Sequence, residues 1–233
     1  MIVLAIDTAT TDLVAGLVEV SGGQPAQRAE RVVPTRSHNE LLVPTVRELL
    51  AEEGLEFKDL GAVVVGCGPG PFTGLRVGMA TASAFGQALG IPVHGVCTHD
   101  AVAALIDAES SLVVTDARRR EVYWAQYRGG QRIAGPGVAA PAALRLPGGD
   151  EADTGFVDVL SVPVHLREQV LAEGAVAATT VTYVAPRPAG LVAVADLTAE
   201  PEPLVPLYLR RPDAKEPAPK PKSPAIPDVA GKA

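Results

Sequence analysis

The segment between Gly66 and Gly95 constrains the fold most, and it reads GCGPGPFTGLRVGMATASAFGQALGIPVHG. A glycine-rich loop follows an apolar run and leads into a predicted helix over 73–89. Small residues recur at every fourth position, which places them in one stripe along the helix: Gly74, Gly78, Ala82, Gly86 and Gly90. A glycine inside a helix costs roughly 1 kcal/mol relative to alanine. The stripe therefore indicates close contact with another backbone.

Two interpretations of this stripe remain open. Either the helix is covered by the same chain, or one side of it awaits a partner. The helix expected over 38–53 also has a wide apolar face, which favours the partner. We therefore expect the two helices to form a partner interface with these residues: Leu42, Val46, Leu49, Leu75, Gly78, Met79, Ala82 and Gly86.

The glycine-rich loop matches neither common phosphate-binding fingerprint. A P-loop requires Lys-Ser or Lys-Thr after its last glycine, and no such pair follows Gly74. The dinucleotide pattern requires a third glycine where Pro71 stands. A stiff turn explains the Gly-Pro pairs better, because glycine supplies positive φ and proline fixes its neighbours. An anion at the start of the following helix is a lesser alternative.

Composition and charge exclude several classes of protein. The chain has 233 residues, 47% of them hydrophobic, and a formal net charge of −7. Because an acidic chain repels phosphate backbones, we expect contact with nucleic acid only through a complex. Arg76 and Gln87 interrupt the longest apolar stretch, so we expect no membrane span. Two cysteines without CxxC spacing and no predicted secretory signal favour a cytoplasmic protein.

Two stretches share one layout, LAIDTATTDLVAGLVEVSGG and LVVTDARRREVYWAQYRGG. Each has a strand, an aspartate, a turn and a second strand, which favours two similar lobes facing each other across a cleft. Carboxylates at such a cleft could hold Mg²⁺ through water, so Asp7, Thr8 and Asp116 are candidate nucleotide-cleft residues. The alternative, which we favour, is that each aspartate accepts amides of its own turn.

The motifs AIDTAT, SHNELLVP, GPGPFTGLRVG, TDARRREVYWAQY and PLYLRR together resemble the TsaB (YeaZ) family of bacterial tRNA-modification proteins. The likeness covers most of residues 1–128 and the stretch 206–211. It implies an α/β fold of two RNase H-like lobes, the actin-like/sugar kinase/Hsp70 (ASKHA) architecture. We expect lobes at 1–97 and 98–211, and a disordered Pro/Lys/Ala tail at 212–233.

The resemblance also implies a function. TsaB-like proteins are not the transferase. They pair with a TsaD-type catalytic subunit through the two first-lobe helices, and the pair recruits a TsaE-type ATPase. The complex places threonylcarbamoyl on the adenosine next to the anticodon of tRNA. We therefore expect a non-catalytic scaffold that reaches tRNA only through the complex and forms a weak homodimer when alone. ATP or ADP and Mg²⁺ would bind only at a complex interface, so we expect no cofactor of its own.

The catalytic relatives carry an H-x-x-x-H metal pair, and the stretch that resembles it here is IPVHGVCTHDAVAA. The first ligand position falls on Gly95 and the second on His99. His94 and His99 are five residues apart, so they do not share a helical face. An improvised site with Cys97 and Asp100 is a lesser alternative, and we expect no metal site.

Two further hypotheses concern charged residues. One is an ATP-binding actin-like or sugar kinase-like ATPase that uses Asp7 and Asp116. The other concerns the dense basic cluster Arg118–Arg120, for which a solvated turn is the favoured interpretation. The alternative is a contact to an acidic partner surface or to tRNA within the assembly.

Overall fold

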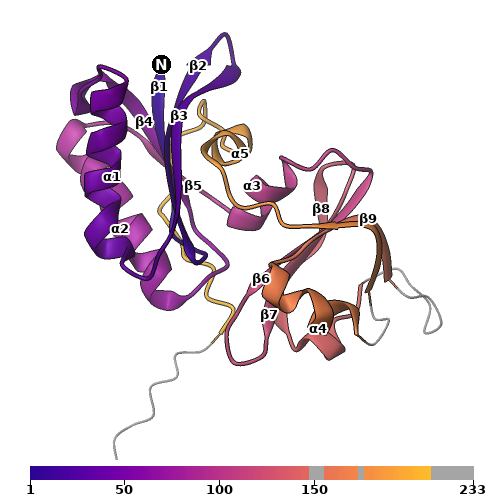
Figure 1. Ribbon diagram of the computed structural model, residues 1–233. Helices are drawn as coiled ribbons and strands as arrows, with labels where there is room; N and C mark the ends of the chain where they lie inside the picture. The colour runs from indigo at the N-terminus through magenta and orange to yellow at the C-terminus, as the bar shows by residue number, and fades with distance from the viewer. Residues whose placement is uncertain (147–154, 173–175, 211–233) are drawn as a thin grey trace, which may run out of the picture.

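The computed structural model describes residues 1–146, 155–172 and 176–210, and it contains two five-stranded sheets, each with helices beside it (Figure 1). The first sheet has the order β3-β2-β1-β4-β5 and the second the order β10-β9-β6-β7-β8. Read from the hairpin edge, both sheets therefore have the same topology. This arrangement confirms the predicted two-lobe α/β fold. The predicted tail at 212–233 lies outside the described residues.

The strands of the first sheet are β1 (Ile2–Asp7), β2 (Asp12–Ser21), β3 (Gln24–Pro34), β4 (Leu60–Gly66) and β5 (Val93–Val96). Those of the second sheet are β6 (Ser110–Asp116), β7 (Val122–Arg128), β8 (Gln131–Ala139), β9 (Gly155–Ser161) and β10 (Val176–Thr182). The α-helices are α1 (His38–Glu52), α2 (Phe72–Leu89), α3 (Thr98–Ala103), α4 (Arg167–Leu171) and α5 (Pro188–Ala193). The described residues also form three short 3₁₀ helices, η1 (Phe57–Asp59), η2 (Pro141–Ala143) and η3 (Val164–Leu166). None of the described helices is long and apolar enough to cross a membrane.

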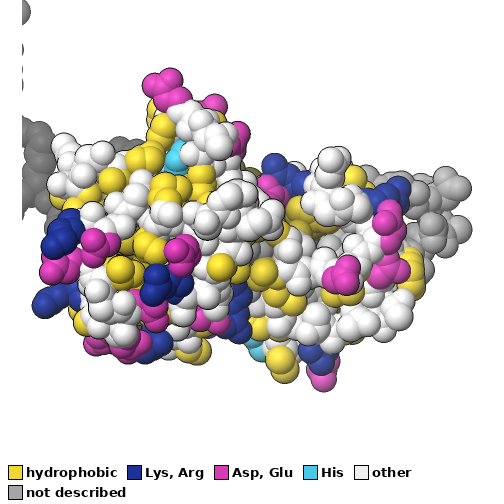
Figure 2. All heavy atoms as spheres, turned by 90° about the horizontal axis from the view of Figure 1, so that it is seen from above, with side chains coloured by type: hydrophobic (Ala, Val, Ile, Leu, Met, Phe, Trp, Pro, Cys, Tyr) yellow, Lys and Arg dark blue, Asp and Glu magenta, His cyan; other side chains and the backbone are white. Residues whose placement is uncertain are grey.

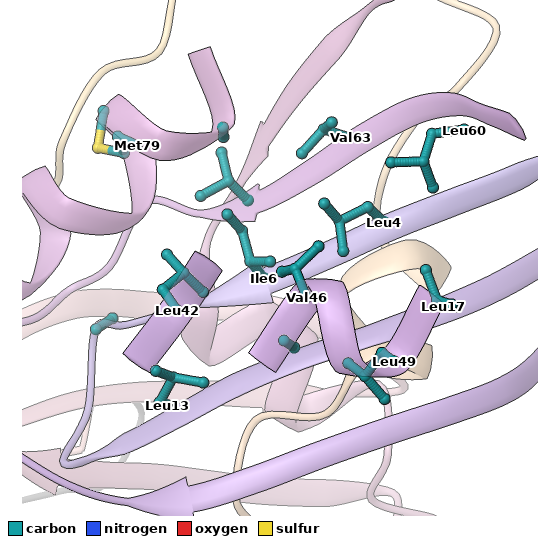
Figure 3. Packing of buried hydrophobic residues seen from close by; sticks show 14 of the residues in the cluster. Leu4, Ile6, Leu13, Leu17, Leu42, Val46, Leu49, Leu60, Val63 and Met79 are labelled. Atoms are coloured by element: carbon teal, nitrogen blue, oxygen red, sulfur yellow. The ribbon is translucent and has the colours of Figure 1, made fainter. Parts of the chain in front are cut away.

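Both faces of the first sheet are covered. Helices α1 and α2 lie on one face, and α3 and α5 lie on the side toward the second lobe (Figure 1). Strand β1 is therefore apolar along its length rather than alternating, as expected for a strand that is buried on both faces. Its Leu4 and Ile6 enter the core under α1 and α2, whereas Val3 and Ala5 enter the core under α5. Figure 3 shows Leu4 and Ile6 packed among side chains of α1.

The small-residue stripe of α2 faces the chain's own sheet. A Cβ atom at Gly74 would collide with the carbonyl oxygen of Thr8, and one at Gly78 with the hydroxyl of Thr8. A Cβ atom at Gly86 would collide with a methyl group of Val93. The glycines therefore allow α2 to approach β1 and β5 closely. Of the two interpretations of the stripe, cover by the same chain is correct, and the interpretation of the stripe as a groove for a partner is wrong.

The chain returns to the first lobe after β10. Helix α5 packs on β1, β2, β3 and β4, and Leu191 and Val192 lie in that core. The following C-terminal strap (residues 203–210) runs along the first lobe, where the Leu207 amide donates to the Cys67 carbonyl at 2.9 Å. The predicted second lobe at 98–211 is therefore too long, because its last part belongs to the first lobe. Local hydrophobic periodicity does not show which sheet a short helix covers.

The close approach of α2 makes Gly78 sensitive to substitution. Gly78→Leu is expected to lower the free energy of unfolding by about 1–3 kcal/mol, because the new side chain would overfill a packed interface. Ala80→Leu, two residues away on the exposed side of α2, is expected to change it by less than about 0.5 kcal/mol. Urea denaturation of both variants measures the difference. Equal stabilities would contradict the packing described here.

Candidate functional site

A cleft of about 1,210 Å³ lies between the two lobes. On the first lobe it is lined by the turn between β1 and β2 and by the start of α2, and on the second lobe by the turn between β6 and β7. Three arginines border it, together with two aspartates: Arg36, Arg118, Arg210, Asp12 and Asp116. The cleft is thus a polar site of mixed charge, large enough for a ligand of drug size.

Asp7 does not face this cleft. Its side chain is fully buried, where one carboxylate oxygen accepts from the Ala9 amide at 2.7 Å and the other from the Thr98 hydroxyl at 2.6 Å. A Cβ atom at Gly66 would collide with the same carboxylate. Burial raises the pKa of Asp7 to about 6, despite the hydrogen bond from Thr98. The prediction of Asp7 as a cleft residue is therefore wrong, and the alternative that it accepts an amide of its own turn is confirmed.

The other two predicted nucleotide-cleft residues do line the cleft, but both are already hydrogen-bonded. The buried Thr8 hydroxyl donates to the Gly74 carbonyl at 2.7 Å, which joins the end of β1 to the first turn of α2. The Asp116 carboxylate accepts from the Arg118 amide at 2.6 Å, and its second oxygen lies 3.3 Å from Nε2 of His165. Only one of the two carboxylates required by the ATPase hypothesis therefore borders the cleft.

Tyrosines of the second lobe reach across to the first. The Tyr183 hydroxyl donates to the Asp12 carboxylate at 3.0 Å, and the Tyr123 hydroxyl donates to the Gly70 carbonyl at 3.4 Å. Burial, followed by the charge of Asp12, raises the pKa of Tyr183, so its phenol keeps the proton that it donates. These bonds join the lobes at the edge of the cleft, and no local sequence pattern predicts them.

The residues of the improvised metal site have separate partners. His99 is fully buried, and its Nε2 lies 2.9 Å from the Thr115 hydroxyl oxygen. Burial lowers the pKa of His99 to about 3, so the ring is neutral. Asp100 accepts from the Tyr127 hydroxyl at 2.8 Å and from Arg132 at 3.0 Å. Within residues 1–146, 155–172 and 176–210, no three His, Cys, Asp or Glu side chains gather in a way that could hold a metal ion.

The eight residues predicted for the partner interface all lie inside the first lobe. They lie on α1 and α2 and belong to the core beside the sheet, as Figure 3 shows for Leu42, Val46 and Leu49. Leu75 and Ala82 are fully buried, and Gly78 and Gly86 contact the sheet. The prediction of these side chains as an exposed docking surface is therefore wrong for the chain alone. The hydrophobic side of each helix is buried against the apolar face of the sheet, because this contact removes both from water.

Different residues form the outer face, which we define as the exposed side of α1 and α2. On α1 it carries charged side chains, such as Arg47 and Glu48, together with apolar ones, of which Leu41 and Val43 are 37% and 39% exposed. On α2, over residues 77–89, it carries no charged residue and consists of Ala80, Ser83, Ala84, Gln87 and Ala88. Solvent-facing helices normally carry charged side chains, so the α2 part of this face is unusual. The four-residue spacing of Ala80, Ala84 and Ala88 is the signal that could have identified it.

Charges elsewhere on the surface are interspersed. Figure 2 shows basic and acidic side chains side by side on both lobes. Two ion pairs, Arg28–Glu53 at 3.0 Å and Arg31–Glu52 at 2.5 Å, join β3 to the end of α1. The charge-free stretch of α2 contrasts with this pattern.

An aromatic cluster marks the start of α2. The rings of Phe72 and Tyr208 stack with centroids 4.9 Å apart, and the Arg76 guanidinium lies 3.8 Å above the Phe72 ring. Nε of Arg76 donates to the Tyr208 hydroxyl at 3.1 Å. Because Tyr208 belongs to the C-terminal strap, the cluster fixes the strap to the outer face. Phe72 and Tyr208 are nevertheless 41% and 38% exposed.

Comparison with known proteins identifies the family. A family model described as "TsaD: tRNA N6-adenosine threonylcarbamoyltransferase" matches residues 26–214. The chain belongs to the TsaD family. A protein named "tRNA threonylcarbamoyladenosine biosynthesis protein TsaB" from Escherichia coli (strain K12) is 32% identical over 149 residues, 62% of this chain and 63% of that protein. The chain is therefore a TsaB/YeaZ-like member.

A solved structure and two mycobacterial sequences match most of the chain. The structure of "YeaZ from Pseudomonas aeruginosa" aligns with a TM-score of 0.64 and 25% identity, covering 83% of this chain and 89% of that one. An uncharacterized protein of Mycobacterium tuberculosis (strain ATCC 25618 / H37Rv) is 50% identical over 215 residues, 91% of this chain and 93% of that protein. One from Mycobacterium leprae (strain TN) is 51% identical over 222 residues, 92% of this chain. The chain spans only 56% of that longer relative.

The buried carboxyl of Asp7 predicts a specific pH dependence. An aspartate in an unfolded chain titrates near pH 3.9, so the folded state with its raised pKa binds the proton more tightly. Stability is therefore lost as the pH rises between these values. The free energy of unfolding, measured relative to Asp7→Asn, is expected to fall by up to about 3 kcal/mol between pH 4 and pH 7. If the free energies of unfolding of the wild type and Asp7→Asn, measured by urea denaturation, changed in parallel with pH, the raised pKa of Asp7 would be contradicted.

The bond from Tyr183 to Asp12 is expected to hold the lobes together. Tyr183→Phe leaves a nearly buried carboxylate without this donor, so stability should fall by about 1–2 kcal/mol. Hydrogen exchange at amides 8–12 should become faster. Tyr208→Phe is the matched control, because it removes the same atom at an exposed site. Equal stability and equal hydrogen exchange in the two variants would show that the interlobe bond does not stabilise the fold.

Proposed function

We propose that the chain acts in the biosynthesis of threonylcarbamoyladenosine in tRNA, as a non-catalytic scaffold that activates a TsaD-type transferase by forming a heterodimer with it. The observation that carries this proposal is the outer face of α2, which is uncharged over residues 77–89, in a chain whose named relatives include TsaB proteins. The transferase would dock on the outer face of α1 and α2, rather than on the buried stripe of small residues.

The shape of the outer face suits another helix. Alanine side chains at positions 80, 84 and 88 leave little bulk between two backbones, so a partner helix can approach closely. Phe72, Leu41 and Val43 supply apolar area that water now covers. Arg76 and the exposed charges Glu40 and Glu48 lie near this apolar area, where polar groups give specificity more than affinity.

The arrangement of titratable groups supports a scaffold more than a catalyst. His99, at the position that resembles a metal ligand of the catalytic relatives, is neutral, buried and hydrogen-bonded to Thr115. Asp7 is held away from the cleft. The chemistry of transfer would then belong to the TsaD-type partner, and ATP or ADP and Mg²⁺ would bind at a complex interface.

The remaining partners follow from the same assembly. The heterodimer would recruit a TsaE-type ATPase in the cytoplasm, and tRNA would be held by the complex rather than by this chain alone. Without its partner the chain would expose the outer face, and two copies could cover it in an isologous contact. Such a homodimer would be weak, because the face would be complementary to another chain rather than to itself.

The outer face can be tested without disturbing the core. Ala84→Glu places a charge in the uncharged stretch of α2, and it is expected to weaken the heterodimer by more than about 2 kcal/mol, roughly 30-fold in Kd. Ala84→Ser is the matched control and should bind normally. Calorimetric titration with the TsaD-type subunit measures Kd, and thermal unfolding checks that both variants are folded.

Modification of a tRNA transcript by the reconstituted complex should follow the same order as binding. Wild-type chain and Ala84→Ser should support threonylcarbamoylation, and Ala84→Glu should not. Unchanged binding by Ala84→Glu would rule out this docking surface. Full modification without the chain would rule out the scaffold function.

A further inference from the structure

The turn between β6 and β7 has an unusual backbone. Within the described parts of the chain, the non-glycine residues with positive φ are Arg118 at 60°, Arg119 at 53° and Arg120 at 62°. The Ala117 amide donates to the Glu121 carbonyl at 3.1 Å, and this bond closes the turn. Left-handed backbone costs an L-residue with a Cβ roughly 1–2 kcal/mol, so three consecutive examples are expensive.

Other hairpins of the chain meet the same backbone requirement with glycine. The β2–β3 turn has Gly22 and Gly23 at positive φ, and the β7–β8 turn has Gly129 and Gly130. Glycine adopts this conformation without a steric penalty, and asparagine is the next best choice. Arginine has no such advantage. The strained backbone of the arginine turn (residues 118–120) therefore indicates that the guanidinium side chains have a function there.

The charges of the arginine turn are only partly compensated. All three arginines are exposed, and neither Arg118 nor Arg120 forms an ion pair with a described residue. The nearby carboxylates have other partners, because Asp116 faces His165 at 3.3 Å and Glu121 pairs with the strap's Arg210 at 2.8 Å. Arg210 of the strap also donates to the Ala117 carbonyl at 2.7 Å, so a fourth guanidinium lies at the base of the turn.

The distribution of these side chains distinguishes between two kinds of anion. Only Arg118 of the turn lines the interlobe cleft, while Arg119 and Arg120 lie outside it. The set does not converge on one small ion, and it suits successive phosphates of a polymer. Guanidinium groups bind phosphate with paired hydrogen bonds, which lysine cannot form. The net charge of −7 would keep the free chain from binding nucleic acid unaided.

We propose that the arginine turn contacts the phosphate backbone of RNA held by the assembly. This inference rests on the proposed function, which brings the chain beside tRNA. The contact is independent of base sequence and adds affinity once the partner has positioned the RNA. It lies on the second lobe, so it is separate from the outer face through which the partner docks.

The test uses the full chain in complex with its TsaD-type partner. The triple variant Arg118→Asn, Arg119→Gly, Arg120→Asn removes the charges and substitutes residues that favour positive φ, so its melting temperature should be unchanged or higher. Binding of an unmodified tRNA transcript to the complex should weaken by about tenfold near 0.1 M salt. The slope of log Kd against log salt should fall by about one for each arginine.

Two controls test whether the effect depends on the charge of the side chains and whether it is independent of RNA sequence. Replacing the three arginines by lysine keeps the charge, so the salt slope should stay near that of the wild type. An unrelated RNA of equal length should lose affinity to the same extent, since backbone contacts carry no sequence information.

Three results would overturn the proposal. Unchanged tRNA affinity and salt slope in the triple variant, with an active wild-type complex, would exclude the RNA contact and leave the proposed function intact. Weaker binding of the TsaD-type subunit by the triple variant, with tRNA affinity of the formed complex unchanged, would identify the turn as a protein contact. If the wild-type chain neither binds the TsaD-type subunit nor supports modification, the proposed function and this inference both fail.

Discussion

The first lobe depends on the close approach of α2 to its own sheet. Gly74 and Gly78 leave no room for a Cβ beside Thr8, and Thr8 in turn donates to the Gly74 carbonyl. This contact sets the start of α2 at the floor of the cleft and directs its hydrophobic side chains into the core. It also leaves the opposite side of the helix, which is uncharged over residues 77–89, to solvent. The cleft and the outer face therefore both follow from one interface between a helix and a sheet.

Periodicity in the sequence predicted the helices, but it did not show which side of α2 contacts the sheet and which side is exposed. The helix carries two sets of small residues at four-residue spacing, one with Gly78 and Gly86 and one with Ala80 and Ala84. Glycine indicates the closest contact, and in this chain that contact is with the sheet. The same reasoning, applied to the set without glycine, would have identified the outer face. The contacts of Gly74 and Gly78 with Thr8 establish this direction in the structure.

Contacts between distant residues were the part that the sequence did not reveal. Asp7 reads as a cleft carboxylate by its place after a strand, yet Thr98, 91 residues later, binds it in the interior. Residues 188–210 follow the second lobe in sequence, but α5 covers the first sheet and the strap runs along the first lobe. Through Tyr208 and Arg210 the strap contacts both the outer face and the β6–β7 turn. Such pairings depend on topology, and no local pattern encodes them.

Thiol labelling of α2 tests the two-sided account of this helix most directly. Ala84→Cys and Ala82→Cys would each be made in a Cys97→Ser background, because the native Cys67 is buried and Cys97 is more accessible. The account predicts rapid labelling at position 84 in the free chain, protection there once the TsaD-type subunit is bound, and slow labelling at position 82 in both states. Rapid labelling at position 82, or labelling at position 84 that the partner leaves unchanged, would contradict it.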